Sequence, residues 1–220
     1  MRQPRIGIDP SRFRAAVFDL DGTLVDSEPA WEKAKRIVSS RHGRSPTQAQ
    51  IDATIGRSLD VFLREVFEIT DPAEALTRRD EIFAEADEWL PQMRVAVPGA
   101  AAFLRDLRAR GLRIAICSSS GRRHIESAAA FLGIGNDVDL IVSAAELARG
   151  KPDPLPYQVT VQRLGIQPDH AIAVEDAVPG AQSAKAAGLF TVAVGPPAMG
   201  EDFGFCDVQV PGYDALHLTL

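Results

Sequence analysis

Short apolar runs alternate with helix-length amphipathic segments along most of the chain, and this alternation restricts the possible fold more than any other feature. The runs read AAVFDL, LRIAICS, VDLIVS, HAIAVED and LFTVAVG. Apolar runs of this length, bounded by turn residues, predict buried strands. Strands that alternate with helices predict βαβ units and a parallel sheet. We therefore expect an α/β fold, with a Rossmann-like, mainly parallel sheet flanked by helices.

Residues 27–92 follow a different pattern. This stretch has helical spacing and few β-branched runs, and Trp31, Ala34 and Val38 fall on one stripe of a predicted helix. We expect a small α-helical cap domain here, inserted into an α/β core formed by residues 1–26 and 93–220. The two chain crossings, at about 24–28 and 92–98, are the predicted hinge.

Composition excludes several classes of partner. The chain has 220 residues and a formal net charge of −6, which argues against a general nucleic-acid or anionic-membrane binder. No apolar run approaches the roughly 18 residues that a membrane span needs, and the N-terminus lacks the apolar stretch of a signal peptide. Cys117 and Cys206 are too few for a disulfide framework. We expect a cytoplasmic protein without nucleic-acid or membrane partners, and we favour a monomer.

Polar residues follow three of the predicted strands, and a lysine stands in a nearby loop. In parallel sheets the carboxyl ends of strands meet at one crevice, where ligands bind. Carboxylates gathered there repel one another unless a hard cation lies among them, and oxygen ligands suit Mg²⁺. The residues concerned are Asp19, Asp21, Ser118, Lys151, Glu175 and Asp176. The sequence therefore predicts a Mg²⁺ site that faces a phosphate group.

Each of these signals has an ordinary structural explanation when taken alone. "DGT" after a strand is commonly a turn, Ser118 resembles a helix-capping hydroxyl, and an isolated Lys151 is usually solvated. "ED" is a helix-start signal. Their occurrence together, in order and on one side of the predicted sheet, favours the functional interpretation.

In this order the motifs resemble the haloacid dehalogenase superfamily, in particular its phosphatase branch with a helical cap. "DLDGT", "CSSS", "GKP" and "VEDAVPG" are similar to the four motifs of that family. The resemblance implies that Asp19 is the nucleophile, which becomes an aspartyl-phosphate. It also implies that Asp21 protonates the leaving oxygen and then activates water.

The resemblance also implies how the ligands are held. Mg²⁺ is expected at Asp19, at the backbone carbonyl of Asp21 and at Asp176, with Glu175 nearby or acting through water. Ser118, Ser119 and Lys151 are expected to bind the transferring phosphoryl group. Gly22 permits a tight turn whose backbone N–H groups line the phosphate.

Residue types discriminate among the functions of this family. Dehalogenases lack the second aspartate, and phosphonate-cleaving members replace it with alanine; here Asp21 is present. A β-phosphoglucomutase-like mutase stays an alternative, although those enzymes carry a cap histidine where this chain has Trp31. "DSEPAW" is similar to hexose- and hexitol-phosphate phosphatases. We expect a phosphatase acting on a small phosphorylated metabolite, a sugar or sugar-alcohol phosphate. A non-catalytic phospholigand binder would lack these acids.

Two cap residues are candidates for substrate contact. Arg57, in "IGRSLD", falls in the substrate-specificity loop of the family, and a solvated arginine is the equally weighted alternative. Trp31 is the second candidate, and a place in the core of the helical bundle is its alternative. His124 follows Ser118 in a predicted helix beside two arginines, and we expect it on a solvated face.

Overall fold

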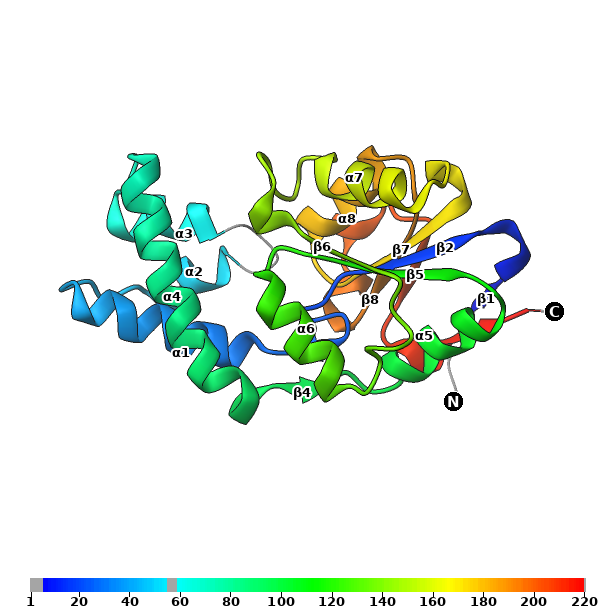
Figure 1. Ribbon diagram of the computed structural model, residues 1–220, viewed down its shortest axis with the longest axis horizontal. Coiled ribbons are helices and arrows are strands. Elements are labelled where there is room, and N and C mark those ends of the chain that lie inside the picture. The colour runs from blue at the N-terminus through cyan, green and yellow to red at the C-terminus, as the bar shows by residue number, and fades with distance from the viewer. Residues whose placement is uncertain (1–5, 55–58, 220) are drawn as a thin grey trace.

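A computed structural model describes residues 6–54 and 59–219, and its centre is a parallel sheet (Figure 1). Within these residues the sheet has the strand order β6-β5-β2-β7-β8-β9, and every neighbouring pair is parallel. Its strands are β2 (Ala15–Phe18), β5 (Arg113–Ser118), β6 (Leu140–Ser143), β7 (Ala171–Glu175), β8 (Phe190–Val194) and β9 (Val208–Val210). The predicted Rossmann-like α/β fold is confirmed.

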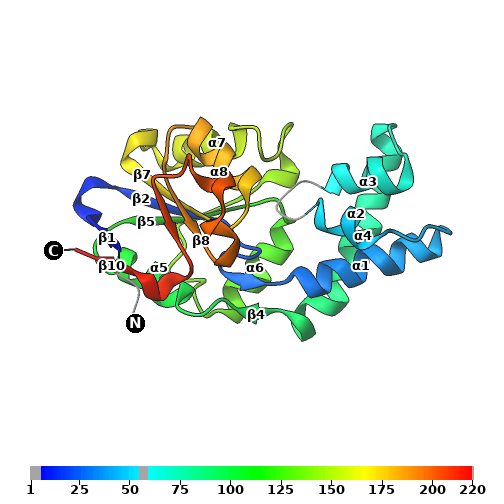
Figure 2. The same cartoon turned by 180° about the vertical axis from the view of Figure 1, so that it is seen from behind.

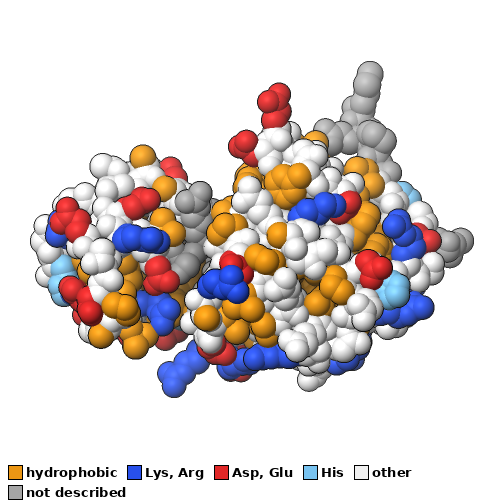
Figure 3. All heavy atoms as spheres, turned by 90° about the horizontal axis from the view of Figure 1, so that it is seen from above, with side chains coloured by type: hydrophobic (Ala, Val, Ile, Leu, Met, Phe, Trp, Pro, Cys, Tyr) orange, Lys and Arg blue, Asp and Glu red, His pale blue; other side chains and the backbone are white. Residues whose placement is uncertain are grey.

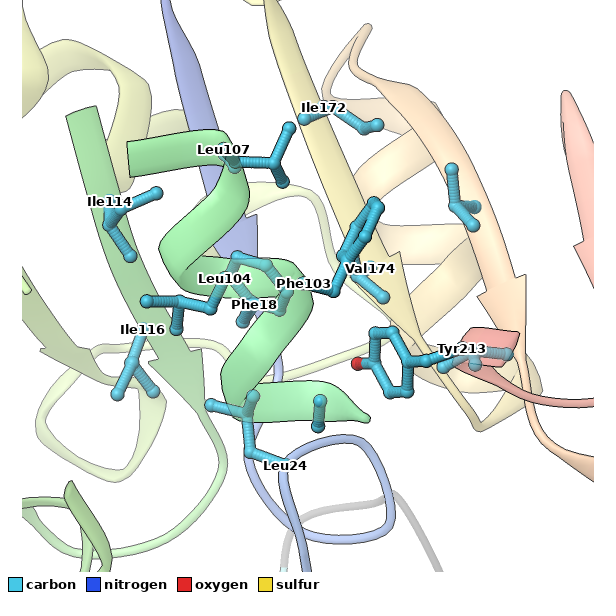
Figure 4. Packing of buried hydrophobic residues seen from close by; sticks show 14 of the residues in the cluster. Phe18, Leu24, Phe103, Leu104, Leu107, Ile114, Ile116, Ile172, Val174 and Tyr213 are labelled. Atoms are coloured by element: carbon cyan, nitrogen blue, oxygen red, sulfur yellow. The ribbon is translucent and has the colours of Figure 1, made fainter. Parts of the chain in front are cut away.

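Helices cover both faces of this sheet. They are α5 (Ala100–Ala109), α6 (Arg122–Phe131), α7 (Leu155–Leu164) and α8 (Val178–Ala186). Successive strand residues point to opposite faces, so Phe18 packs with α5 and α6 while Val17 packs with α7 and α8. Figure 4 shows Phe103 and Leu104 of α5 against Phe18. Because both faces are covered, the strands are apolar throughout, as parallel sheets require.

The insert folds as four helices around a hydrophobic cluster of its own, at the left of Figure 1. In the described residues these are α1 (Glu28–Arg41), α2 (Gln48–Asp52), α3 (Leu59–Phe67) and α4 (Pro72–Met93). Val38, Phe62 and Ile82 are fully buried members of the cluster. Thr47 and Gln50 form a capping box that starts α2, and the Asp71 carboxylate caps α4. Seen from above, the insert is a smaller lobe beside the core (Figure 3).

The chain enters and leaves the insert through two short paired strands. β3 (Val25–Asp26) pairs antiparallel with β4 (Val95–Ala96), and the Val97 N–H donates to the Leu24 carbonyl at 3.0 Å. These residues coincide with the predicted hinge. The domain boundaries and the hinge remain proposals.

The two ends of the described chain lie together, which the sequence pattern did not predict. β1 (Ile6–Ile8) pairs parallel with β10 (Leu216–Leu218), close to where both termini lie in Figure 2. The C-terminal part of the chain also supplies β9 to the sheet edge. Cys117 is buried, and neither it nor Cys206 forms a disulfide within the described residues. Within the described residues, none of the helices combines the length and apolarity needed to cross a bilayer.

Candidate active site

The motif residues converge at the carboxyl ends of three adjacent strands. Asp19 directly follows β2, the central member of the three, while Ser118 ends β5 and Glu175 ends β7. β2 pairs with β5 on one side and with β7 on the other, so strand pairing alone brings these residues to one edge of the sheet. The crevice predicted from the alternating pattern is present.

Lys151 is the central cation of this site. Its side chain is 2% exposed, and its Nζ lies 2.5 Å from Asp19 Oδ1 and 2.6 Å from Glu175 Oε1. It also donates to the Cys117 carbonyl at 3.0 Å. Burial lowers the pKa of Lys151, but Asp19 and Glu175 outweigh burial and hold that pKa above its ordinary value. Lys151 is therefore a charged, fixed partner of the two carboxylates.

Three carboxylates meet closely enough to hold one metal ion. Among the described residues, Asp19, Glu175 and Asp176 each offer an oxygen, and these oxygens lie within 4.8 Å of one another. Burial raises the pKa of Asp19 well above its usual range, and burial together with Glu175 raises the pKa of Asp176 to about 7. Lys151 alone does not balance the buried Asp19 and Glu175 together with the partly exposed Asp176, so the site has the charge and oxygen ligands that a hard divalent cation requires.

Gly22 determines how closely Asp176 approaches the turn after β2. Its φ is +90°, and a Cβ placed on it would lie 2.0 Å from Asp176 Oδ2. Thr23 Oγ1 donates to Asp176 Oδ1 at 3.0 Å. The Gly22 N–H, which we expected to face a phosphate, instead donates to the Val25 carbonyl at 2.7 Å. Gly22 thus adopts a positive φ, and its lack of a side chain leaves room for the Asp176 carboxylate. Its N–H forms a hydrogen bond within the turn.

Asp21 is held by donors from both the core and the insert. Its Oδ2 accepts from Ser120 Oγ at 2.6 Å and from Ser118 Oγ at 3.3 Å. Its Oδ1 accepts from the Ser27 hydroxyl and, at 3.3 Å, from Trp31 Nε1. Its carboxylate is outside the metal-binding cluster, so Asp19 and Asp21 occupy distinct environments although they are two residues apart.

Two of these donors, Ser27 and Ser120, are not among the site residues predicted from the sequence. Ser120 stands in the quoted "CSSS", one residue beyond those we chose, so the motif itself held the signal. Ser27 precedes α1, where a capping hydroxyl is the ordinary interpretation, but it makes no side-chain cap. Only the tertiary fold shows that its hydroxyl reaches Asp21.

Ser119 carries an unused donor in the site. Within the part of the chain that the structure describes, its Oγ is buried and has no hydrogen-bond partner. A buried hydroxyl without a partner is costly, so a ligand acceptor at this position would be stabilised. Ser118, by contrast, also accepts from the Ser120 N–H at 3.0 Å.

A cavity of about 60 Å³ lies between the core and the insert. Its walls are Asp19, Asp21, Ser118, Ser119, Ser120 and Glu175 from the core and Glu28, Trp31, Lys35, Thr54, Leu59 and Phe83 from the insert. The cavity is much smaller than the roughly 300–1,000 Å³ of pockets that enclose drug-sized ligands. Arg57 lies outside the described residues. A larger cavity of about 950 Å³, against β4 and α5, contains none of the clustered carboxylates and is not the candidate site.

The expectation that His124 lies on a solvated face was wrong. His124 is 6% exposed, and its ring stacks on Trp31 with centroids 4.9 Å apart. Its Nδ1 lies 3.4 Å from Asp87 of α4. The helix is amphipathic as predicted, but the insert covers the face that the sequence pattern assigns to water. Trp31 belongs to the cluster of the insert and also lines the cavity.

Comparison with known proteins identifies the family to which this arrangement belongs. Residues 13–188 match the family described as haloacid dehalogenase-like hydrolase. Hexitol phosphatase A of Escherichia coli (strain K12) is 35% identical over 190 residues, which cover 85% of each chain. Validoxylamine A 7'-phosphate phosphatase of Streptomyces hygroscopicus subsp. limoneus is 33% identical over 184 residues, 82% of this chain and 84% of that protein.

Solved structures share the fold. The β-phosphoglucomutase of Clostridium difficile superimposes with a TM-score of 0.80 at 23% identity, over 92% of both chains. At 23% identity, this similarity shows a shared fold and nothing about activity. It includes the insert as well as the sheet, because nearly all of both chains is covered.

Proposed function

This chain belongs to the haloacid dehalogenase-like hydrolases, and on that premise we propose that it is a Mg²⁺-dependent phosphatase of a sugar or sugar-alcohol phosphate. The observation that carries the proposal is the environment of Asp19. Its carboxylate is buried, contacts Lys151 at 2.5 Å, and lies beside two further carboxylates able to share a cation. A nucleophile that must approach an anionic phosphate needs this neutralisation.

The proposed reaction has two displacements. An Asp19 oxygen attacks phosphorus, the ester P–O bond breaks, and Asp21 gives a proton to the departing alkoxide. Water then attacks the aspartyl-phosphate, Asp21 takes a proton from that water, and inorganic phosphate leaves. The covalent step divides one difficult reaction into two easier ones.

The residues around Asp19 have matching tasks. Lys151 neutralises charge on the transferring group, and the unpaired Ser119 hydroxyl donates to one of its oxygens. The backbone N–H groups of Leu20 and Asp21, which have no acceptor among the described residues, are further donors. Mg²⁺ held by Asp19, Glu175 and Asp176 would supply charge neutralisation at the phosphate.

The substrate class follows from the relatives. The names of the two relatives described above specify phosphatases, and one name specifies hexitols. The β-phosphoglucomutase of Clostridium difficile shares the fold at 23% identity. A likeness at this level does not favour phosphoryl transfer between sugar positions over hydrolysis. The position of Trp31, where mutases of this fold are expected to carry histidine, also supports hydrolysis.

Closure of the insert over the core is part of the proposal. A cavity of about 60 Å³ leaves too little space for a sugar phosphate to enter, so the insert must move. Ser27 and Trp31, which hold Asp21, lie at the start of the insert. Closure therefore orients the acid while it excludes water. A disulfide that ties the insert to the core near the β3–β4 pair should suppress turnover.

The first test is phosphate release from a panel of small phosphate esters. Release is expected with Mg²⁺, and it should stop with EDTA or in the Asp19→Asn variant, which removes the nucleophile but keeps its shape. Hydrolysis by a folded Asp19→Asn protein would contradict the role of Asp19. Isomerised sugar phosphate without release would favour a mutase.

A further inference from the structure

Lys35 of α1 is a buried cation that forms no ion pair with any of the described residues. It is 4% exposed, although lysine is almost never buried without a partner. Its Nζ donates to Thr54 Oγ1 at 2.8 Å, and no carboxylate of the described residues lies within ion-pair distance. Burial lowers the pKa of Lys35 more than the nearby carboxylates, Glu28 first among them, raise it. The insert thus carries a desolvated ammonium at a cost to its own stability.

In the described part of the chain, Lys35 has a neutral hydrogen-bond partner, Thr54, whose own hydroxyl proton is already used. Thr54 Oγ1 donates its own proton to the Ile51 carbonyl at 2.6 Å, so it only accepts from Lys35. An ammonium has three N–H donors. Among the described residues Thr54 takes one, and the Phe62 ring lies 5.8 Å from Nζ on another side. Two donors and a positive charge remain for another group.

Lys35 lines the same cavity as the proposed nucleophile. The cavity wall includes Asp19 and Ser119 from the core and Lys35 and Thr54 from the insert. A phosphate bound at Asp19 would therefore have the rest of its ester directed toward the wall that contains Lys35. Glu28 also lines this wall, two turns before Lys35 on α1. Its carboxylate acts to raise the pKa of Lys35, but the two side chains do not form an ion pair.

We propose that Lys35 is a specificity-determining residue that binds a second anionic group, a carboxylate or a second phosphate, on the leaving portion of the substrate. This inference rests on the proposed phosphatase function and narrows its substrate class to doubly anionic sugar or polyol esters. An anionic oxygen group would place a counter-charge within hydrogen-bond distance of Nζ and accept hydrogen bonds from the two unused N–H donors. A neutral polyol would accept hydrogen bonds but would bring no counter-charge.

Matched pairs of esters test the proposal. Glucose-6-phosphate and 6-phosphogluconate differ by a carboxylate, and fructose-6-phosphate and fructose-1,6-bisphosphate differ by a phosphate. The wild type should hydrolyse the more anionic member of one pair with about tenfold or higher kcat/KM. Which pair shows the preference distinguishes the carboxylate from the phosphate.

Lys35→Met should remove this preference, and Lys35→Arg should restore part of it. p-Nitrophenyl phosphate, which has no second anion, should be affected far less than the preferred ester. The matched control is Lys33→Met on the same helix, because the Lys33 ammonium lies over the Trp89 ring and outside the cavity. It should keep the preference. The proposal would be overturned if Lys35→Met lowered kcat/KM equally for both members of each pair. It would also be overturned if the wild type preferred neither member of either pair.

Binding separates this inference from the proposed activity. Calorimetric titration of the same esters into Asp19→Asn, with and without Lys35→Met, measures selectivity without turnover. If the wild type releases no phosphate from any ester, the phosphatase proposal fails, while weaker binding of the doubly anionic ester to the Lys35→Met variant would still support Lys35. Unchanged binding would reject Lys35 even in an active enzyme.

Discussion

The core and the insert of this protein bury their hydrophobic residues in different architectures. In the core, Phe18, Ile116 and Val174 are fully buried in a sheet covered on both faces. The insert is a bundle of helices around a smaller cluster of its own, which contains Phe62 and Leu63. Figure 1 shows the two side by side, connected through the short strands β3 and β4.

This difference assigns different tasks to the two regions. The core fixes the carboxylates at or directly after strand ends, where neighbouring strands limit their movement, and it supplies Lys151 from the loop before α7. The insert reaches the site through single side chains such as Trp31 and Lys35. A rigid region can therefore hold the reacting groups, while a region with its own hydrophobic cluster can move and select.

The strongest test compares one cavity mutation in each region. Leu104→Ala in α5 and Leu63→Ala in α3 remove equally buried side chains, and each should cost about 2–5 kcal/mol. Leu104→Ala should lower the free energy of unfolding of the whole protein. Leu63→Ala should first increase hydrogen exchange in α1 and α4 and leave β2 and β7 protected. Equal loss of protection in both regions would show a single cooperative unit.

A second comparison uses two glycines with positive φ. Gly22→Ala in the core places a Cβ 2.0 Å from Asp176 Oδ2 and should lower kcat/KM about 100-fold, because it displaces a carboxylate of the cluster. Gly43→Ala, at the end of α1, meets nothing within 4 Å. It should cost about 1 kcal/mol of stability and leave turnover intact. Phosphate release and thermal unfolding measure both, and an active Gly22→Ala enzyme would refute the steric argument.

The Trp31→Phe variant tests how strongly the insert orients the carboxylate of Asp21. It removes the 3.3 Å hydrogen bond to Asp21 but keeps an aromatic ring against His124. We expect kcat to fall about five- to tenfold, equivalent to about 1 kcal/mol. Trp89→Phe is the control, because the Trp89 indole donates to Glu85 at 3.0 Å outside the cavity. Equal kcat values for the two variants would mean that Trp31 does not position Asp21.

The smallest expected effect is a pH dependence at the contact between the two regions. Burial lowers the pKa of His124, Asp87 and Asp21 act to raise it, and Arg94 lowers it further. The neutral ring therefore stabilises the folded state above the ordinary histidine pKa near 6.5, and this stability is lost as pH falls through the lowered pKa.

His124→Gln should accordingly flatten the acid side of the stability profile by about 1 kcal/mol or less. Urea unfolding between pH 7 and pH 5 measures this change. His42→Gln is the matched control, because His42 is more exposed and pairs with Glu81 at 2.8 Å. A profile unchanged by His124→Gln would show that the contact does not titrate.

The sequence predicted much of the site because its residues follow strands. Asp19, Ser118, Glu175 and Asp176 end apolar runs that pair as neighbours in the sheet, and parallel pairing brings such ends together without further information. Ser27 and Lys35 gave no such signal. A serine before a helix and a lysine on a helix have ordinary explanations, and their importance depends on what the folded insert faces.

By itself, then, the sequence determined the parallel sheet, the helical insert and the order of the acidic motifs, because hydrophobic periodicity and strand ends are local properties of a chain. Only the tertiary structure decided which side chains meet across the gap between insert and core. It buried His124 against Trp31, tied the Gly22 N–H into its turn and enclosed Lys35. The physical reason is that burial depends on the neighbour that covers a surface, and that neighbour lies far away in the sequence.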